Sequence, residues 1–236
     1  MQWIKTSRFK IFGLVLTVLG LVGLLALLEF FEFFGDRQSR TLSASVAGLE
    51  LPDSARVERF DFEKKSIEGW KTVDGKWTVE EMPGAPSGKK VLVQRAVENQ
   101  FNVLVAPGGP YSDVDVSVRF KPISGREDAS GGIVFRFSEG RYYVVRANAL
   151  EDNFRLYYYD RVRNQLATAK VKPPVLGQWH TLRVVAVGDH IQAYLNGQLL
   201  LDHLDSRFRS GQVGLWTKSD SVTAFDDLEI KSYNSK

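Results

Sequence analysis

Arginines, carboxylates, amides and tyrosines gather between residues 136 and 159 of this chain. Sugar-binding sites combine planar aromatic rings with arginine, amide and carboxylate groups that fix hydroxyls, so this composition fits a glycan. Tyrosine and arginine are equally typical of protein interfaces, and pairing of arginines with acids across strands would account for the same residues structurally. The candidate residues, with two more from a loop near the C-terminus, are Arg136, Arg146, Asn148, Glu151, Asp152, Asn153, Arg155, Tyr157, Tyr159, Lys218 and Asp220.

Hydrolysis of a glycosidic bond needs two carboxyl groups flanking that bond, about 5–5.5 Å or about 6.5–9.5 Å apart. In the acidic run that opens the region of strands, Glu58 and Asp61 are three residues apart and so point to opposite faces of a strand. Asp61 and Glu63 share a face, which we assign to the outer side. Asp226 and Asp227 are also split, and we expect one to hold a loop rather than a Ca²⁺ ion. No residue is therefore predicted to be catalytic.

Several other chemistries have no residues to carry them. The chain has no cysteine, which excludes disulfides, thiolate metal sites and thiol nucleophiles. His180, His190 and His203 lack metal-ligand spacing, and neither a Gly-x-Ser-x-Gly elbow nor a phosphate-binding glycine loop is present. The formal charge of +3 comes from interspersed residues of both signs, so we expect no nucleic acid partner. We also expect no metal and no cofactor.

The candidate residues must be positioned by β-strands. Phe154–Tyr159 is one of several short runs of β-branched and aromatic residues separated by polar breaks, which is typical of strands. Because side chains alternate along a strand, Arg155, Tyr157 and Tyr159 share one face, and the residues between them share the other. One face must pack, and the other can meet a partner.

The same pattern predicts an all-β domain over residues 57–236, folded as a two-sheet antiparallel sandwich of the jelly-roll type. No convincing helical period appears after the N-terminal region, and Asn196-Gly197 is the strongest hairpin signal. The expected strands are Val57–Glu63, Trp77–Glu81, Val91–Gln94, Asn102–Ala106, Val114–Lys121, Ile133–Phe137, Tyr142–Ala147, Phe154–Tyr159, Gln165–Lys170, Trp179–Val187, His190–Leu195, Gln198–Asp202, Gln212–Thr217 and Thr223–Lys231.

The N-terminal region predicts one transmembrane helix over residues 11–34. Ile11–Leu28 carries no charge, and phenylalanines extend it to about the length that a bilayer requires. The basic residues of the 1–10 segment hold it in the cytoplasm, so residues 35–56 form a linker to a periplasmic or other extracytoplasmic domain at the inner membrane. The alternative is a cleaved signal peptide, whose cleavage site would be Ser45-Val46-Ala47, well beyond the apolar run.

Two features of this helix bear on its partners besides membrane lipid. Small residues recur on one helical face and could admit close packing against another helix, although glycine is also common in single spans. Acidic residues at the outer boundary either snorkel to water or meet a basic patch on a neighbouring membrane protein. The residues concerned are Gly13, Thr17, Gly20, Gly23, Glu29 and Glu32.

Three stretches together resemble a known family: GGIVFRF followed by YYVVRANALEDNFRLY, then GQWHTLRVVAVGDHIQAYLNGQLL, then GQVGLWTKSDSVTAFDDLEI. From about Phe60 to Ile230 they are similar to the concanavalin A-like lectin/glucanase superfamily, specifically to its bacterial 3-keto-disaccharide hydrolase-like domains. The resemblance implies a concanavalin A-like sandwich. Lectins, glycosidases and interaction domains share that sandwich, so function has to be argued from the site.

A sandwich without a catalytic pair, held by an uncleaved anchor, favours a non-catalytic recognition or docking module in the membrane. Its expected partner is another subunit of a membrane protein complex or a glycan of the envelope. The alternative implied by the resemblance is a glycoside or 3-keto-disaccharide hydrolase, with Glu151 or Asp152 as general base and Arg146 polarising the substrate. A passive spacer without a ligand is a third hypothesis.

Overall fold

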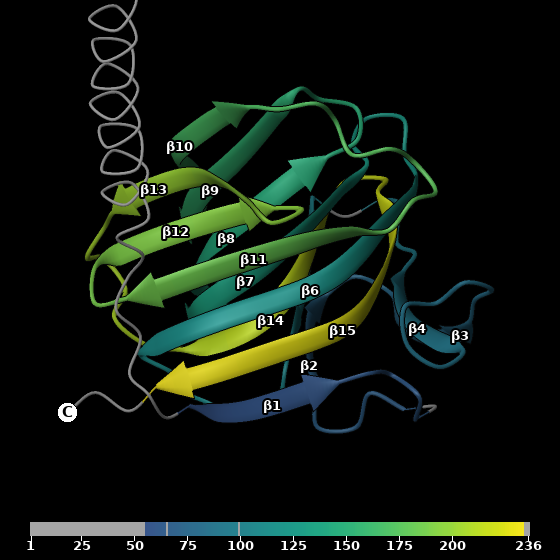
Figure 1. Ribbon diagram of the computed structural model, residues 1–236, viewed down its shortest axis with the longest axis horizontal. Coiled ribbons are helices and arrows are strands. Elements are labelled where there is room, and N and C mark those ends of the chain that lie inside the picture. Colours follow the sequence, from purple (N-terminus) through teal and green to yellow (C-terminus); the bar gives the residue numbers. More distant parts are fainter. Residues whose placement is uncertain (1–54, 65, 99, 234–236) are drawn as a thin grey trace, which may run out of the picture. The chain divides into compact units, whose positions relative to one another are not determined.

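Strands form nearly all of the regular structure in the computed structural model, which describes residues 55–64, 66–98 and 100–233 (Figure 1). The described residues contain no helix. The strands are β1 (Arg56–Phe60), β2 (Lys71–Asp74), β3 (Trp77–Glu81), β4 (Lys90–Gln94), β5 (Phe101–Val105), β6 (Asp113–Ser124), β7 (Ser130–Ser138), β8 (Arg141–Asn148), β9 (Asn153–Asp160), β10 (Val162–Lys170), β11 (His180–Val187), β12 (His190–Leu195), β13 (Gln198–Leu204), β14 (Gln212–Lys218) and β15 (Val222–Tyr233).

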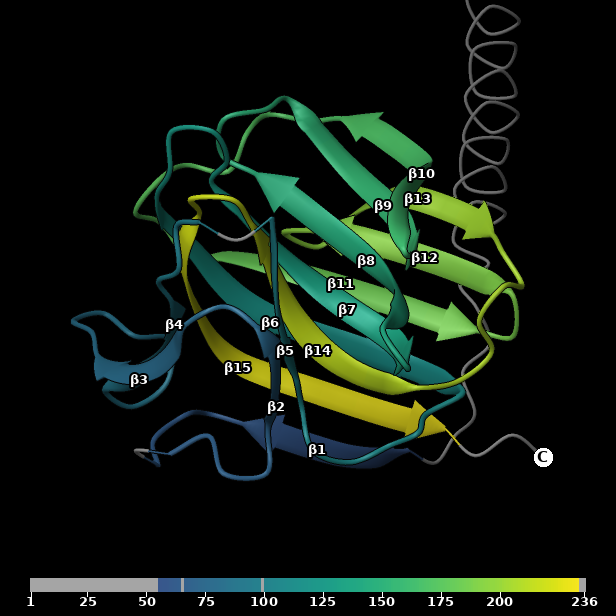
Figure 2. The same ribbon diagram turned by 180° about the vertical axis from the view of Figure 1, so that it is seen from behind.

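These strands form two stacked sheets. The front sheet, nearest the viewer in Figure 1, has the order β13-β12-β11-β6-β15-β4-β3, and β1 also pairs with β15. The back sheet, nearest the viewer in Figure 2, has the order β10-β9-β8-β7-β14-β5-β2. The pairings between the described strands are antiparallel. The predicted all-β, two-sheet sandwich is therefore confirmed.

The core lies between the sheets and follows the alternation of side chains. The even-numbered residues of β6 from Val114 to Phe120 point inward, where they meet Ile133 and Phe135 of β7 and Val145 of β8. All of these side chains are at most 1% exposed. Because neighbouring side chains on a strand point to opposite faces, burying these residues fixes which residues of every strand face outward.

Several strands extend beyond their predicted ends, such as β6, which continues to Ser124, and two other differences have a structural reason. β1 ends at Phe60 rather than Glu63, because Phe62 adopts a left-handed backbone conformation (φ 54°) that leaves the strand. β2 was not predicted at all. Its four residues are all exposed, so they have none of the buried alternation that marks a strand in a sequence.

Arg136, a candidate site residue, instead braces the interior at one end of the sandwich. Its backbone is left-handed (φ 53°) at an irregularity of β7, and the residue is only 2% exposed. The guanidinium donates to the carbonyl oxygens of Ser112 at 3.0 Å, Gly188 at 2.7 Å and Phe208 at 2.9 Å. Three separate loops are therefore joined by one buried cation, and no surface is left for a ligand.

Asp226 holds a loop, as expected for one member of the Asp226-Asp227 pair. Its carboxylate accepts hydrogen bonds from Ser87 N at 3.0 Å, Ser87 Oγ at 3.1 Å and Asp227 N at 2.8 Å. The residue is fully buried. Burial, reinforced by the negative charge of Asp227, outweighs the hydrogen bonds from Ser87 and raises the pKa of Asp226 from 3.8 to about 6.

The predicted membrane helix over residues 11–34, its cytoplasmic segment and nearly all of the linker lie outside the described residues. Within the described ranges, no helix is long and apolar enough to cross a bilayer.

The raised pKa of Asp226 predicts that this carboxyl contributes a loss of stability as the pH rises from about 4 to about 6. In this window the folded protein binds a proton that the unfolded chain has released, so the free energy of unfolding falls with pH. The shift of about two units corresponds to roughly 3 kcal/mol. Urea unfolding at several pH values should show that stability falls more, or rises less, with pH in the parent chain than in Asp226→Asn over this window. The comparison isolates Asp226, because carboxyls with lowered pKa such as Glu80, Glu151 and Glu229 contribute the opposite slope in both proteins.

The exposed Asp189 supplies a matched control, because Asp189→Asn removes one carboxyl without touching the buried loop contact. We expect that variant to keep the slope of the parent chain. An unchanged slope in Asp226→Asn would contradict the assignment.

Candidate functional site

The outer face of the back sheet collects most of the remaining candidate residues. Arg146 of β8 lies opposite Arg155 of β9, and Tyr157 and Tyr159 follow on the same side of β9. The residues between them on β9 pack into the core between the sheets. The alternation predicted for this strand is confirmed.

A carboxylate and two arginines form the polar end of this face. Glu151, in the turn after β8, lies 2.6 Å from Arg146 Nη2 and 3.8 Å from Arg155 Nη1. The Arg146 side chain is 3% exposed, against about a third for each of the other two. Partial burial disfavours the ionised form of Glu151, but the hydrogen bond and charge of Arg146 outweigh it and lower the pKa of the Glu151 carboxyl.

Aromatic rings fill the middle of the face. Trp216 of β14 stacks on Phe101 of β5 with ring centres 5.7 Å apart, and Tyr142 stacks on Tyr159 at 5.0 Å. Gly132 of β7 makes room for the indole, because a Cβ at this position would lie 3.2 Å from the Trp216 ring. The rings of Trp216 and Tyr142 are buried although they lie on the outside of the sandwich, and only Phe101 and Tyr159 are partly exposed.

Arg163 of β10 covers these rings. Its guanidinium carbon lies 4.4 Å from the ring centre of Tyr157, 5.0 Å from that of Phe101 and 5.9 Å from that of Trp216. Tyr157 is only 4% exposed as a result. The arginine therefore occupies the flat surface that a stacked sugar ring would use. We call Arg146, Glu151, Arg155, Tyr157, Tyr159 and Arg163, together with Phe101 and Trp216, the arginine face.

Three donor atoms on the arginine face and one acceptor beside it are buried without a hydrogen-bond partner among the described residues. They are Arg155 Nε, Arg163 Nη1, Trp216 Nε1 and Asn153 Oδ1. Buried polar atoms are nearly always paired, so each such atom needs a partner from solvent or a ligand. At the Tyr159 end, a polar hollow is lined by Glu139, Arg141, Asp160 and Arg161.

Comparison with known proteins gives the family. Residues 59–231 match the 3-keto-alpha-glucoside-1,2-lyase-like domain. The chain belongs to this family. The resemblance to concanavalin A-like 3-keto-disaccharide hydrolase domains, which the three stretches indicated, is therefore confirmed.

Solved structures share the fold of this lyase-like domain at low sequence identity. The carbohydrate-binding module CBM66 from Bacillus subtilis superposes with a TM-score of 0.60 at 22% identity, covering 70% of this chain and 96% of that module. A beta-glucanase from Bacillus licheniformis gives 0.53 at 14% identity, covering 77% and 99%. Levanase of B. subtilis strain 168 is 23% identical over 173 residues, or 71% of this chain. This chain spans only 23% of that enzyme's length.

Four candidate residues of the domain lie away from the arginine face and do not border it. Arg136 braces the interior, and the Asn148 Oδ1 atom, fully buried, accepts from the backbone of Ala129 and Leu150. The Asp220 carboxylate accepts from three consecutive backbone N–H groups of residues 126–128, and Lys218 pairs with Asp128 at 3.3 Å. These residues hold loops. The sequence clustered them with the site because their loops adjoin its strands along the chain.

Asp152 and Asn153 border the arginine face without joining its pairs of charges. Asp152 lies 3.6 Å from Lys170 at the exposed edge beside β10, where both side chains are largely in solvent. Such a pair contributes little to stability. Among the described residues, no group of three or more histidine or acidic side chains is placed to bind a metal ion.

Arg163, Phe101 and Trp216 belong to the arginine face but were not predicted to. Arg163 lies opposite Tyr159 in the pairing of β10 with β9, one strand further along the chain. That position would have been visible had the hairpin register been assigned. Trp216 reaches the face only because β14 lies beside β7 in the sheet, a neighbour distant in sequence that propensity does not reveal.

Removing the covering arginine should uncover the rings beneath it. In Arg163→Ala we expect a red-shifted tryptophan emission and stronger acrylamide quenching, with a loss of roughly 1–2 kcal/mol of stability from the lost cation–π contacts. The change should disappear in a Trp216→Phe background. Arg161→Ala, which removes an exposed arginine two residues away, should leave the emission unchanged. Identical quenching of Arg163→Ala and the parent would contradict the covering role.

Proposed function

We propose that this domain binds a glycan without cleaving it, and that the arginine face is its binding surface. The observation that carries the proposal is the pair of buried guanidinium nitrogens, Arg155 Nε and Arg163 Nη1, that have no partner among the described residues. Guanidinium groups donate strong hydrogen bonds to hydroxyl and acid oxygens. Arg163 lies over the Tyr157 ring, and Arg155 donates to the hydroxyl of the same tyrosine. A saccharide supplies many such oxygens within a short distance.

The contacts differ from those of a sugar lying flat on tyrosine. Because Arg163 already covers Tyr157, the glycan meets guanidinium N–H groups rather than that ring. Phe101 and Tyr159, which are partly exposed, offer apolar edges beside the arginines. The proposed surface therefore combines hydrogen-bond donors at its centre with aromatic contacts at its rim.

The likeness to a carbohydrate-binding module and the match to part of a levanase support binding to a carbohydrate. They support the fold more directly than the ligand, because every identity is below 25%. The arginine face supplies the hydrogen-bond donors that such a ligand would need.

The state of Glu151 favours binding over hydrolysis. A general base must reach the proton that it removes, with a pKa matched to that step. The Glu151 carboxylate is instead held by Arg146, with its pKa lowered. Only 3% of the Arg146 side chain is exposed, so this arginine cannot polarise a substrate.

The proposal also includes the anchor read from the sequence. Residues 11–34 would cross the inner membrane once, with the β domain on the periplasmic or extracytoplasmic side. Gly13, Thr17, Gly20 and Gly23 would then be available to a second membrane protein. Under this proposal the chain holds an envelope glycan near the membrane, alone or as a subunit of a complex.

Binding to a broad panel of saccharides tests the arginine face. Arg155→Ala and Arg163→Ala should each lower the affinity for the saccharide about tenfold or more, since a hydrogen bond to a charged group contributes roughly 1.5–3 kcal/mol. Lys172→Ala, which removes an exposed cation elsewhere, should have no effect. A flat response of the parent chain across the panel would remove the proposed function.

Membrane anchoring is tested with the full-length chain. It should remain in the membrane fraction after alkaline carbonate extraction, and protease added to spheroplasts should digest the β domain. Purification in mild detergent then distinguishes a chain that acts alone from a subunit of a complex, because a subunit is recovered together with its partners. Recovery of the full-length chain in the soluble fraction would contradict the anchor.

A further inference from the structure

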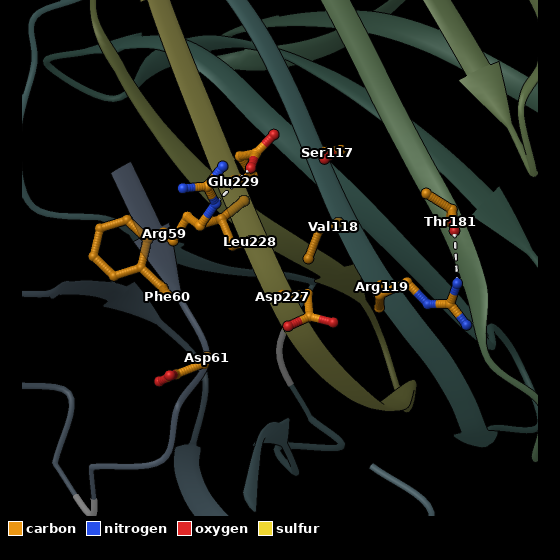
Figure 3. Close-up of a pocket in the computed structure, with 10 residues that line it drawn as sticks. All are labelled: Arg59, Phe60, Asp61, Ser117, Val118, Arg119, Thr181, Asp227, Leu228 and Glu229. Carbon is orange, nitrogen blue, oxygen red and sulfur yellow. Dashed lines mark hydrogen bonds and ion pairs between the residues drawn. The ribbon is translucent and has the colours of Figure 1, made fainter. Parts of the chain in front are cut away.

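A second hollow lies on the opposite side of the sandwich, on the outer face of the front sheet. Its volume is about 340 Å³, near the lower end of the roughly 300–1,000 Å³ common for ligand pockets. It opens where β15 bulges between its partners. Figure 3 shows Asp227 near its centre, with the end of β1 on one side and Arg119 on the other. The lining residues are Arg59, Phe60, Asp61, Ser117, Val118, Arg119, Thr181, Asp227, Leu228 and Glu229.

A bulge in β15 creates this hollow. The register between β15 and β6 shifts between Asp226 and Glu229. On the other edge of β15, pairing with β4 ends at Phe225, and pairing with β1 begins at Leu228. Bulges commonly re-aim a side chain and are frequent beside functional sites.

Asp227 is the residue that the bulge re-aims. Its backbone is left-handed (φ 48°), a conformation that is uncommon for any residue with a Cβ. Its backbone N–H donates to Asp226, but its carboxylate has no hydrogen-bond partner among the described residues. A strained backbone that exposes an unpaired carboxylate beside a hollow suggests a function for that carboxylate.

Arg119 supplies a donor on the other side of Asp227. Its Nη1 donates to Thr181 Oγ1 at 3.3 Å, which directs the guanidinium along the front sheet. Its Nε is buried without a hydrogen-bond partner in the described part of the chain. The hollow thus has an unused acceptor in the Asp227 carboxylate and, beside it, an unused donor in Arg119.

The other charges near the hollow are already engaged. Glu229 pairs with Arg59 at 2.7 Å and with Lys231 at 2.9 Å. The Asp61 carboxylate accepts from the backbone of Glu63 at 3.2 Å. What remains is the carboxylate of Asp227 opposite the guanidinium of Arg119. A neutral polyhydroxylated ligand suits this pair, because a hydroxyl can donate to one and accept from the other. An anionic ligand would meet Asp227 and Asp61.

We propose that this hollow binds one residue of a neutral saccharide, with Asp227 accepting from its hydroxyls and Arg119 donating to its oxygens. The site is independent of the arginine face, since it lies on the other sheet and shares no residue with it. A domain with both sites would hold glycan on two opposite surfaces.

Calorimetric titration of the full-length chain with glucose, galactose, mannose, fructose, sucrose, maltose and cellobiose tests the proposal. At least one should bind, and Asp227→Asn and Arg119→Met should each weaken it about tenfold. Glucuronate should bind more weakly than glucose because Asp227 repels it. Glu81→Gln, a neutralised carboxyl at an exposed strand end, should leave the affinity unchanged.

Asp227→Gly separates binding from folding. Glycine adopts a left-handed backbone without strain, so the melting temperature should rise by about 2–4 °C while saccharide affinity falls. A purely structural Asp227 would not give this combination. The proposal is overturned if no saccharide of the panel binds, or if the Asp227 and Arg119 variants bind as the parent does.

Variants of the arginine face distinguish binding at that face from binding in the hollow. If Arg155→Ala and Arg163→Ala abolish all binding while Asp227→Asn has no effect, the saccharide lies on the back sheet alone and the second site is wrong. If Asp227→Asn weakens one saccharide and Arg155→Ala does not, the hollow binds that saccharide independently, whatever becomes of the arginine face.

Discussion

The back sheet is apolar on both of its faces, and this constraint shapes the rest of the domain. Its inner face packs against the front sheet, while its outer face carries Trp216, Tyr142 and Tyr157, all nearly inaccessible to water. No third layer of strands or helices covers that outer face in the described residues. The stem and planar head of Arg163 cover it instead, because guanidinium groups stack favourably on aromatic rings. The residues that cover the surface are therefore also the ones available to a partner.

The sequence predicted the strands well, because burial imposes a period of two on nearly all of them. It placed Arg155, Tyr157 and Tyr159 on one face for the same reason. It failed where position depends on contacts between distant segments. Arg136 is of a residue type that is common in binding sites, yet its side chain lies in the interior because three loops converge on it. Lys218 and Asp220 are likewise taken up by a loop some ninety residues away along the chain. Residue type alone does not separate a buried brace from a binding group.

The two outer faces of the sandwich present different chemical groups to a ligand. The back sheet carries an arginine over aromatic rings, whereas the hollow on the front sheet sets a lone carboxylate beside one arginine. Neither arrangement is specified by the fold, since sandwiches of this kind carry many unrelated functions. On each face, the candidate site depends on one local departure from regular sheet structure. On the back sheet it is the arginine folded over Tyr157, and on the front sheet it is the bulge that turns Asp227 outward.

The pairing of the first strand with the last one has a mechanical consequence. Arg56 lies opposite Ser232, so the described chain enters and leaves the domain side by side. Hydrogen bonds between antiparallel strands run perpendicular to them. A pull along β1 loads its bonds to β15 together, whereas a pull across it opens them one after another from Arg56. Tension on the preceding segment would thus be resisted in shear or released by peeling, according to its direction, and β1 would yield before the core between the sheets was disturbed.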